Sequence, residues 1–225
     1  PRRTEIVYEY QTAAASEPED ETPDYPVHAF LSREGYFKKI TPKSLNMSSE
    51  QKYKEGDGPF LQWEANNRDE LLVFTDRQQC YKTRMSDFED AKASVLGDYL
   101  PTKLGFDEGE SPLWAVVTGD FAGHILFFFE NGKAARVELS AYATVSNRRK
   151  LTGAYSDKSP LVCILPLPED RELALVSTEP RALLVHTSLL TPKTTRNVQG
   201  VAVMTLKPKY HLETVLLSEE TSITR

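Results

Sequence analysis

Positively charged side chains in short loops are the residues of this sequence whose chemistry stands out. The densest cluster is Arg148-Arg149-Lys150, in the stretch SNRRKLTG, and Lys193 and Arg196 lie in a second loop, PKTTRN. Arg and Lys in such loops suit phosphate oxygens, and phosphate contacts give affinity without reading a base sequence. The pattern predicts binding to a polyanion, provided that the fold brings these loops to one surface.

No arrangement typical of an enzyme accompanies these cations. The sequence has no H-E-x-x-H, G-x-S-x-G or Walker A pattern. Its four histidines lack metal-ligand spacing, and acidic pairs such as Glu108/Glu110 lie in turn-like stretches. We expect no catalytic residue, no metal and no cofactor in this chain, so the hypothesis that it is an enzyme on its own is the weakest one.

Net charge changes sign along the chain. The whole sequence carries −6, with −5 in residues 1–26, −5 in residues 27–132 and +4 in residues 133–225. The sign of a segment matters more than the sum when the partner is polyanionic. The C-terminal half therefore suits a nucleic acid better than the first half does.

Composition indicates a soluble, cytoplasmic globular protein. No stretch approaches the roughly 20 apolar residues that span a membrane, and no signal-peptide pattern is present. The start, which lacks an initiator Met, looks like a piece of something longer. Cys80 and Cys163 are the only cysteines, and we expect them to be buried reduced thiols, although a disulfide is an open alternative.

Short apolar clusters predict an all-β domain after an acidic linker. Residues 11–26 are acidic and poor in large apolar side chains, which favours a flexible segment. From Val27 onward, clusters rich in β-branched and aromatic residues alternate with turn formers. Asn131-Gly132, between the apolar run 124–129 and an alternating stretch, is the strongest hairpin signal.

This hairpin has three counterparts. Each copy is an apolar strand, a polar turn and a second strand that ends in a small or polar residue before Leu, Phe or Tyr, and the four copies are residues 29–45, 72–88, 127–142 and 174–190. Stretches 58–63, 111–117 and 159–165 add a proline just before an apolar strand, and 211–217 takes this place in the fourth copy. The period of roughly 45–55 residues is that of propeller blades. The alternative is a β-sandwich whose hairpins are similar by coincidence.

The repeats resemble blades of the C-terminal domain of bacterial type IIA topoisomerase A subunits, which are those of DNA gyrase and topoisomerase IV. REGYFKKITPKSL, FTDRQQCYKTRMSDF, FENGKAARVELSAY and TTRNVQGVAVMTL carry the resemblance, which covers nearly all of the chain outside the linker. Residues 2–6, RRTEI, resemble the junction between cleavage core and C-terminal domain.

The resemblance implies a β-pinwheel, a propeller-like disc whose blades exchange strands, with about four blades in either a closed disc or an open arc. Residues 1–26 would be the end of the cleavage core plus the linker, and 27–225 the pinwheel, with blades near 27–69, 70–118, 119–170 and 171–218. It implies a rim that binds and bends duplex DNA. The DNA-cleaving tyrosine and the ATPase would lie outside this chain, so Tyr8 and Tyr10 are not that nucleophile.

One departure bears on the type of enzyme. Gyrase proper has a QRRGGKG box after its first blade hairpin, whereas the stretch here is SSEQKYKEGDG (48–58), with no paired glycines and no arginine. The difference puts gyrase-type wrapping in doubt and favours a topoisomerase IV-like or degenerate role.

Cations at matching positions of successive blades would follow a phosphate backbone. The predicted DNA-binding residues are Lys38, Lys39, Lys43, Lys82, Arg84, Lys103, Lys133, Arg136, Arg148, Arg149, Lys150, Lys193 and Arg196. Phe127, Phe128 and Phe129 are interpreted as blade core rather than a base-stacking platform. The predicted partners are duplex DNA, the cleavage core and the ATPase subunit, with no membrane. A competing hypothesis is a protein-interaction module without DNA binding, motivated by the acidic first half.

Overall fold

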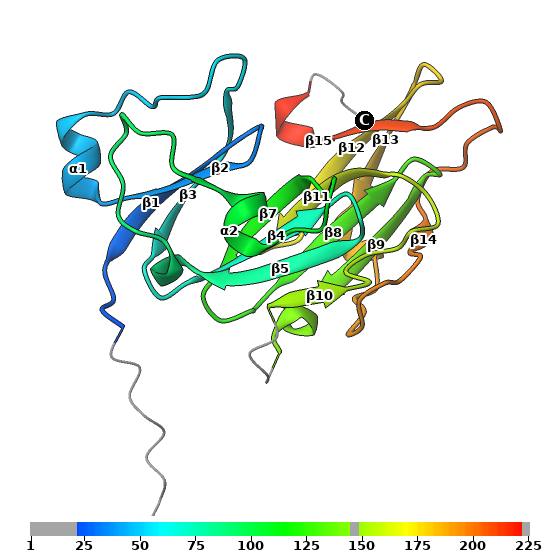
Figure 1. Ribbon diagram of the computed structural model, residues 1–225. Helices are drawn as coiled ribbons and strands as arrows, with labels where there is room; N and C mark the ends of the chain where they lie inside the picture. The colour runs from blue at the N-terminus through cyan, green and yellow to red at the C-terminus, as the bar shows by residue number, and fades with distance from the viewer. Residues whose placement is uncertain (1–21, 145–148, 222–225) are drawn as a thin grey trace, which may run out of the picture.

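Four small antiparallel sheets, arranged as successive blades of a propeller-like disc, make up the chain (Figure 1). The computed structural model describes residues 22–144 and 149–221. The all-β, propeller-like fold predicted from the repeats is confirmed. The predicted linker lies mostly outside the described residues, since only its last five positions are described.

The first two sheets have four strands each, in the orders β3-β1-β2-β6 and β10-β5-β4-β7. The strands of the first sheet are β1 (Pro26–Ser32), β2 (Tyr36–Ile40), β3 (Pro59–Asn66) and β6 (Asp98–Tyr99). Those of the second are β4 (Glu70–Thr75), β5 (Gln79–Arg84), β7 (Pro112–Thr118) and β10 (Lys150–Thr152).

The third sheet has the order β11-β8-β9-β14, and the fourth has three strands in the order β13-β12-β15. The strands of the third are β8 (His124–Phe129), β9 (Lys133–Glu138), β11 (Leu161–Leu167) and β14 (Val201–Ala202). Those of the fourth are β12 (Glu172–Ser177), β13 (Arg181–His186) and β15 (Leu212–Leu217).

Short helical turns follow the hairpins and loops. Two are α-helical, α1 (Pro42–Met47) and α2 (Leu100–Leu104), and four are 3-10 turns, η1 (Met85–Asp87), η2 (Leu139–Tyr142), η3 (Thr187–Leu189) and η4 (Ser218–Glu220). Each hairpin is followed by one such turn, where the sequence repeats place a small or polar residue before Leu, Phe or Tyr. None of the described helices is long and apolar enough to cross a membrane.

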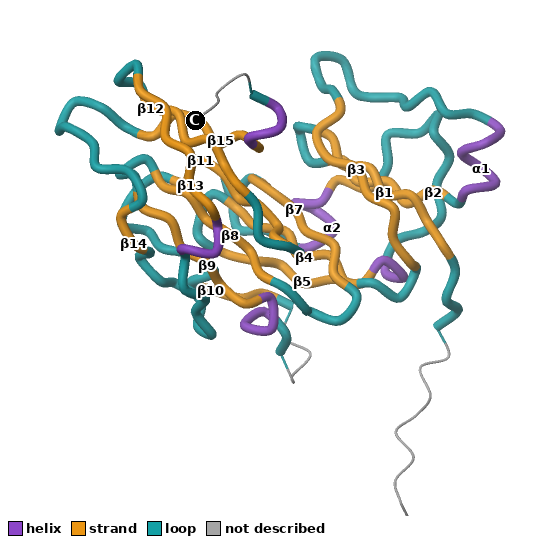
Figure 2. Tube along the Cα trace, turned by 180° about the vertical axis from the view of Figure 1, so that it is seen from behind, coloured by secondary structure: helices purple, strands orange, loops and turns teal. Residues whose placement is uncertain are grey.

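Strand exchange joins the first three sheets to the repeat that follows each of them. The edge strands β6, β10 and β14 pair with β2, β5 and β9, which lie 58 or more residues earlier in the chain. Figure 2, from behind, shows the strands of each blade together with the long loops that carry the chain between blades. The exchange implied by the family resemblance is therefore present.

The cores lie between neighbouring blades, which explains the run of three phenylalanines. Successive side chains of a strand point to opposite faces, so Phe127 and Phe129 pack against Leu72 and Phe74 of the second blade. Phe128 packs on the other face, against the fourth blade. All three rings are almost completely buried, so their interpretation as blade core is confirmed. Burial of each ring contributes about 2 kcal/mol.

The Asn131-Gly132 turn closes the predicted hairpin. Strands β8 and β9 are antiparallel, with Phe128 opposite Ala134. Gly132 adopts a φ of 74°, in the left-handed region, and a Cβ there would lie 2.2 Å from the carbonyl oxygen of Met204. Glycine is therefore required both by the turn and by the close approach of the fourth repeat.

Both cysteines are free thiols, as expected, but only Cys80 is buried, whereas Cys163 is partly buried. Burial raises the pKa of the Cys163 thiol to about 11 and raises the pKa of the fully buried Cys80 well above its ordinary value. Since the thiolate is the reactive form, we predict that iodoacetamide at pH 8 modifies neither thiol in the folded protein and both after denaturation. Mass spectrometry of the alkylated protein checks this. Rapid modification of the native protein would contradict it.

Candidate nucleic-acid interface

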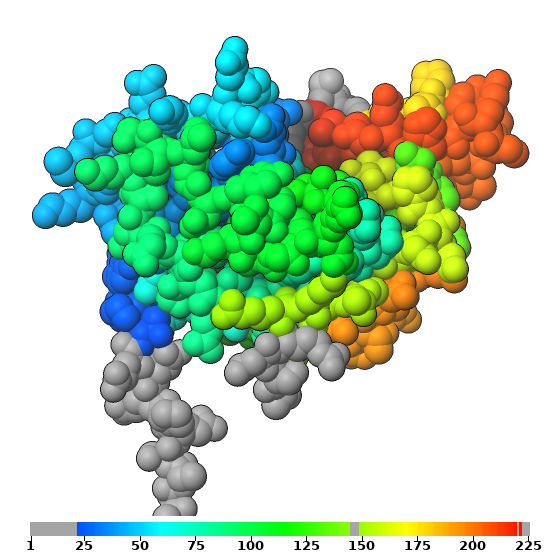
Figure 3. All heavy atoms as spheres, viewed as in Figure 1, coloured from blue at the N-terminus to red at the C-terminus, as the bar shows by residue number. Residues whose placement is uncertain are grey.

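Two exchanged segments meet at one place on the rim of the disc. Residues 150–153 belong to the third repeat but pair with the second sheet, and residues 193–202 belong to the fourth repeat but run along the third sheet. The two segments line a shallow hollow of about 610 Å³. Figure 3 shows the yellow-green segment near residue 150 beside the orange segment near residue 195. The fold therefore brings together the two loops that the sequence singled out.

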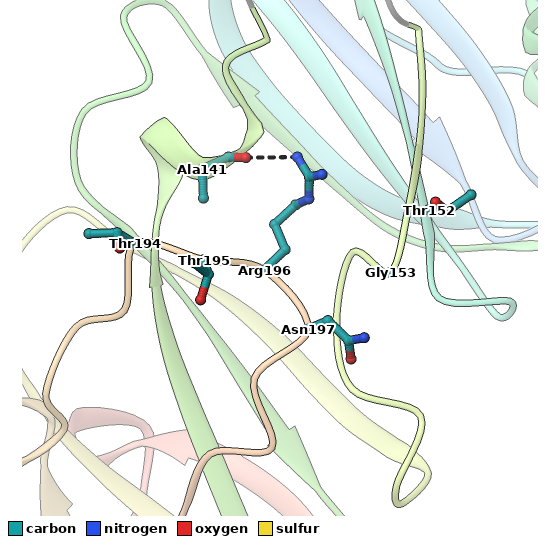
Figure 4. Close-up of a pocket in the computed structure, with 7 residues that line it drawn as sticks. All are labelled: Ala141, Thr152, Gly153, Thr194, Thr195, Arg196 and Asn197. Carbon is teal, nitrogen blue, oxygen red and sulfur yellow. Dashed lines mark hydrogen bonds between the residues drawn. The ribbon is translucent and has the colours of Figure 1, made fainter.

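Polar side chains line this hollow. Its walls are Ala141, Thr152, Gly153, Thr194, Thr195, Arg196 and Asn197. Figure 4 shows Arg196 reaching across to η2, where Nη1 donates a hydrogen bond of 2.9 Å to the carbonyl oxygen of Ala141. The guanidinium also lies 6.0 Å from the centre of the Tyr142 ring. Arg196 thus holds its loop against the third blade as well as bringing positive charge to the rim.

A glycine in the left-handed region marks each exchanged segment. These residues are Gly97, Gly153 and Gly200, with φ values of 94°, 62° and 74°. Gly97 and Gly200 directly precede the donor strands β6 and β14, whereas Gly153 follows the donor strand β10. Arg149 and Arg196 therefore do not occupy matching positions of the strand pairing, although both belong to exchanged segments. Lys92, in the loop before Gly97, is also exposed and was not among the residues predicted from the sequence.

Some cations of the predicted set are exposed to solvent. Arg149 is 71% exposed, and its nearest acidic atom is Asp87 Oδ2 at 3.7 Å. The structure also exposes Lys43 on α1, Arg84 at the end of β5 and Lys193, whereas Lys133 is half-buried. Surface ion pairs at such a distance contribute little and exchange readily for a phosphate.

Lys38 and Lys39 do not lie on the exposed rim, which corrects the expectation from sequence. Both are 3% exposed. Lys38 Nζ donates to the carbonyl oxygens of Lys52 (3.0 Å) and Ala93 (3.3 Å), and burial lowers the pKa of this ammonium group. The apolar strand pattern does not distinguish a lysine that points to solvent from one whose charge is satisfied inside the blade.

Lys39 ties three segments of the chain together. Its Nζ donates to Asn67 Oδ1 at 2.6 Å and lies 3.1 Å from Asp90 Oδ1. Tyr25 O–H donates to the same Asp90 carboxylate, and Asn67 Nδ2 donates to the carbonyl oxygen of Pro23. This cluster fastens the residues just before β1 onto the first two blades, so the role that its geometry supports is structural.

Four further predicted cations are engaged by acidic side chains. Arg136 is 9% exposed in its side chain, bonds Asp170 Oδ1 at 2.8 Å and donates to the carbonyl oxygen of Thr187 in η3, which joins the third blade to the fourth. Lys150 donates to both oxygens of Asp107, which raises the pKa of the lysine and lowers that of the carboxyl. Two weaker ion pairs are Lys82–Glu70 at 3.6 Å and Lys103–Asp98 at 3.9 Å.

Arg148 falls outside the described residues, directly before Arg149. Among the residues that are described, no group of three or more His, Cys, Asp or Glu side chains could hold a metal ion.

Curated proteins with a sequence similar to this chain include A subunits of DNA topoisomerase 4. It is 26% identical to the A subunit of DNA topoisomerase 4 from Bacillus subtilis over 120 residues, which are 52% of this chain and 15% of the relative. It is 24% identical to the corresponding protein of Staphylococcus epidermidis over 182 residues, which are 79% of this chain and 23% of the relative. The chain thus spans less than a quarter of these relatives. No protein-family model matches it.

Solved structures give the same result for the fold. The C-terminal domain of DNA topoisomerase IV superposes with a TM-score of 0.74 at 25% identity, over 87% of this chain and 62% of that one. The E. coli ParC C-terminal domain gives 0.62 at 14% identity, over 85% and 79%, and the DNA gyrase A C-terminal domain gives 0.55 at 17%, over 87% and 66%. In sequence and fold, this chain is similar to the C-terminal domain of the bacterial topoisomerase IV A subunit, within the family that its repeats resemble.

Proposed function

We propose that this chain is the DNA-binding and DNA-bending C-terminal domain of a type II topoisomerase A subunit. It holds duplex DNA by the phosphate backbone, without sequence preference, and presents the bound segment to the catalytic core. The observation that carries the proposal is the meeting of two exchanged segments on one side of the rim: residues 150–153, which directly follow Arg149, and residues 193–202, which contain Arg196.

The geometry supports contact with a backbone rather than with bases. Arg149 and Lys193 are exposed and come from the loops of successive repeats. Phosphate oxygens are bound by such cations, whereas single-stranded DNA is held by stacking on aromatic rings. Rings such as Phe127, Phe128 and Tyr142 are buried and offer no stacking surface.

The rest of the reaction belongs to other parts of the enzyme in this proposal. The cleavage tyrosine lies in the core of the same polypeptide, and ATP hydrolysis lies in a separate protein of the holoenzyme, so these are the domain's protein partners. The domain itself needs no cofactor. The stretch 48–58, without a gyrase-type box, favours a topoisomerase IV-like activity for the parent enzyme.

Titration with salt tests the proposal. We expect binding to a 40-base-pair duplex to weaken steeply with salt, measured by fluorescence anisotropy between 50 and 200 mM KCl. Each lost phosphate contact reduces the slope of log K against log salt by about 0.9, so Arg149→Ala with Lys193→Ala reduces it by about 1.8.

A second pair of lysines provides the control. Lys54 and Lys158 are 51% and 64% exposed and lie outside the two loops. Their double alanine variant has the same net charge as the test variant and should keep the original slope. Binding that is absent, or that does not depend on salt, overturns the proposal; equal loss in both variants refutes the assignment to these loops.

Protein interaction is the second candidate function. The observation that favours it is that Lys38, Lys39, Lys82 and Lys103 of the first two blades are buried or paired with acidic groups. Chemical cross-linking to the catalytic core in the absence of DNA, together with no shift of duplex at 50 mM salt, would favour this candidate over the first.

A further inference from the structure

Two acidic side chains of the second repeat lie against the basic loop of the third repeat. Lys150 Nζ donates to both carboxylate oxygens of Asp107, at 2.8 and 2.7 Å, and Arg149 Nη2 lies 3.7 Å from Asp87 Oδ2. Both acids come from residues 27–132, the segment that carries −5, and both cations come from the segment that carries +4. Part of the charge difference between the two halves is therefore met inside the molecule, at a loop that the proposed function assigns to DNA.

The loop that carries Asp107 is anchored by another carboxylate. Glu110 is 5% exposed, and its oxygens accept the backbone N–H of Asp107 (2.8 Å), the hydroxyl group of Tyr81 (2.8 Å) and that of Thr75. Phe106 stacks on the Tyr81 ring, with 4.4 Å between the ring centres. Hydrogen bonds to an ionised acceptor are stronger than bonds between neutral groups. The backbone of this loop is thus held in place without the side chain of Asp107.

The exchanged strand β10 does not depend on the ion pair either. Its backbone pairs with β5, with Lys150 opposite Tyr81. The side chains of Lys150 and Asp107 are 38% and 45% exposed, and an ion pair at such exposure contributes little to stability. Gln79 Nε2 donates to Asp107 Oδ2 at 2.9 Å and so directs the carboxylate. Two anionic oxygens that receive an ammonium group are also what a DNA phosphate offers to a lysine.

We propose that Asp107 occupies the place of a DNA phosphate on Lys150 and thereby limits the affinity of the rim for duplex. This inference rests on the proposed function. Arg149 and Lys193 are exposed and take the first phosphates, whereas Lys150 binds one only after Asp107 has released it. The released carboxylate then lies close to the DNA backbone and repels it. Both effects weaken binding, so removal of this one carboxylate tightens it.

Asp107→Asn tests the proposal, because the amide has the shape of the carboxyl group and retains an oxygen that accepts from Gln79. Binding is measured by fluorescence anisotropy with the same duplex and salt range as above. One added phosphate contact makes the slope of log K against log salt steeper by about 0.9. At 100 mM KCl the affinity should rise roughly five- to tenfold.

Glu108→Gln is the matched control. Glu108 is exposed and follows Asp107 in the loop, and no hydrogen bond or ion pair joins its carboxylate to the part of the chain that the structure describes. The control loses the same charge from the same loop, so a general electrostatic effect changes both variants equally. Only Asp107→Asn should steepen the slope by a whole contact, and adding Lys150→Met to it should remove the gain.

Each remaining outcome overturns the inference in a recognisable way. If the unaltered chain binds duplex and Asp107→Asn gains no more than Glu108→Gln, the inference fails while the proposed function stands. A gain that survives Lys150→Met belongs to another cation and also refutes it. Absence of binding by all four proteins overturns the proposed function and this inference together. Urea midpoints should stay close to that of the unaltered chain, and a large loss in Asp107→Asn would show instead that its carboxylate is structural.

Discussion

Replacing Gly200 by alanine is expected to lower the free energy of unfolding by about 3–4 kcal/mol. Two costs add. A non-glycine residue at a φ of 74° costs about 1–2 kcal/mol, and the new Cβ would lie 2.3 Å from the carbonyl oxygen of Ala134. The backbone cannot move away as a flexible side chain can, so β14 must separate from β9 in the variant. Met204, which is buried between the third and fourth blades, would then become exposed to solvent. Overpacking of this kind adds about 1–3 kcal/mol.

Gly105 provides the control for the backbone cost alone. Its φ is 67°, close to that of Gly200, but a Cβ there meets nothing within 4 Å. We expect Gly105→Ala to cost about 1 kcal/mol. Urea denaturation followed by circular dichroism measures both variants. If the two variants lose the same stability, the exchanged segment is not held closely against β9.

Replacing Lys39 by methionine is expected to cost about 2–3 kcal/mol of unfolding free energy. Methionine keeps most of the side-chain volume, so the loss comes from the contacts to Asn67 and Asp90 rather than from a cavity. Asn67 is 3% exposed and would keep an unsatisfied amide oxygen. Leaving a buried partner of a charged group unpaired costs about 1.5–3 kcal/mol.

Lys43→Met removes the same charge from an exposed position on α1 and should change stability by less than about 0.5 kcal/mol. The pair also separates structure from DNA binding. The slope of duplex affinity against salt should be unaltered in Lys39→Met at a temperature where it is folded, because its ammonium group is inside the protein. Wild-type stability of Lys39→Met, or a flatter salt slope in this variant, would contradict the structural role.

Local patterns along the chain were sufficient to predict the fold. Asn131-Gly132 predicted a hairpin because a two-residue turn of this kind needs residues that accept a positive φ, and the structure has it. Proline just before an apolar run predicted the first residues of β3 and β7, which are Pro59 and Pro112. These features depend on near neighbours in sequence, where the chemistry of the turn or strand end is decided.

Which of the predicted cations are exposed and which are buried could not be predicted in the same way. Lys39 and Arg149 are both basic residues beside apolar strands, yet one is 3% exposed and the other 71%. The difference comes from Asn67, directly after β3 of the first blade, and from Asp90, which reaches Lys39 only after the second repeat has packed on the first. Alternation of apolar and polar residues carries no information about which acidic group will arrive from another repeat.

The four repeated hairpins and the all-β class follow from the amino-acid sequence alone, because each depends on turn geometry and on apolar residues close along the chain. Three further outcomes required the folded molecule: Arg196 lies beside the exchanged segment that follows Arg149, Lys38 and Lys39 are internal, and β13 pairs with a strand on one side only among the described residues. These outcomes depend on contacts between residues far apart in the sequence, from 51 positions for Lys39 and Asp90 to 71 for Cys80 and Leu151, and such contacts are fixed by the packing of one blade against the next.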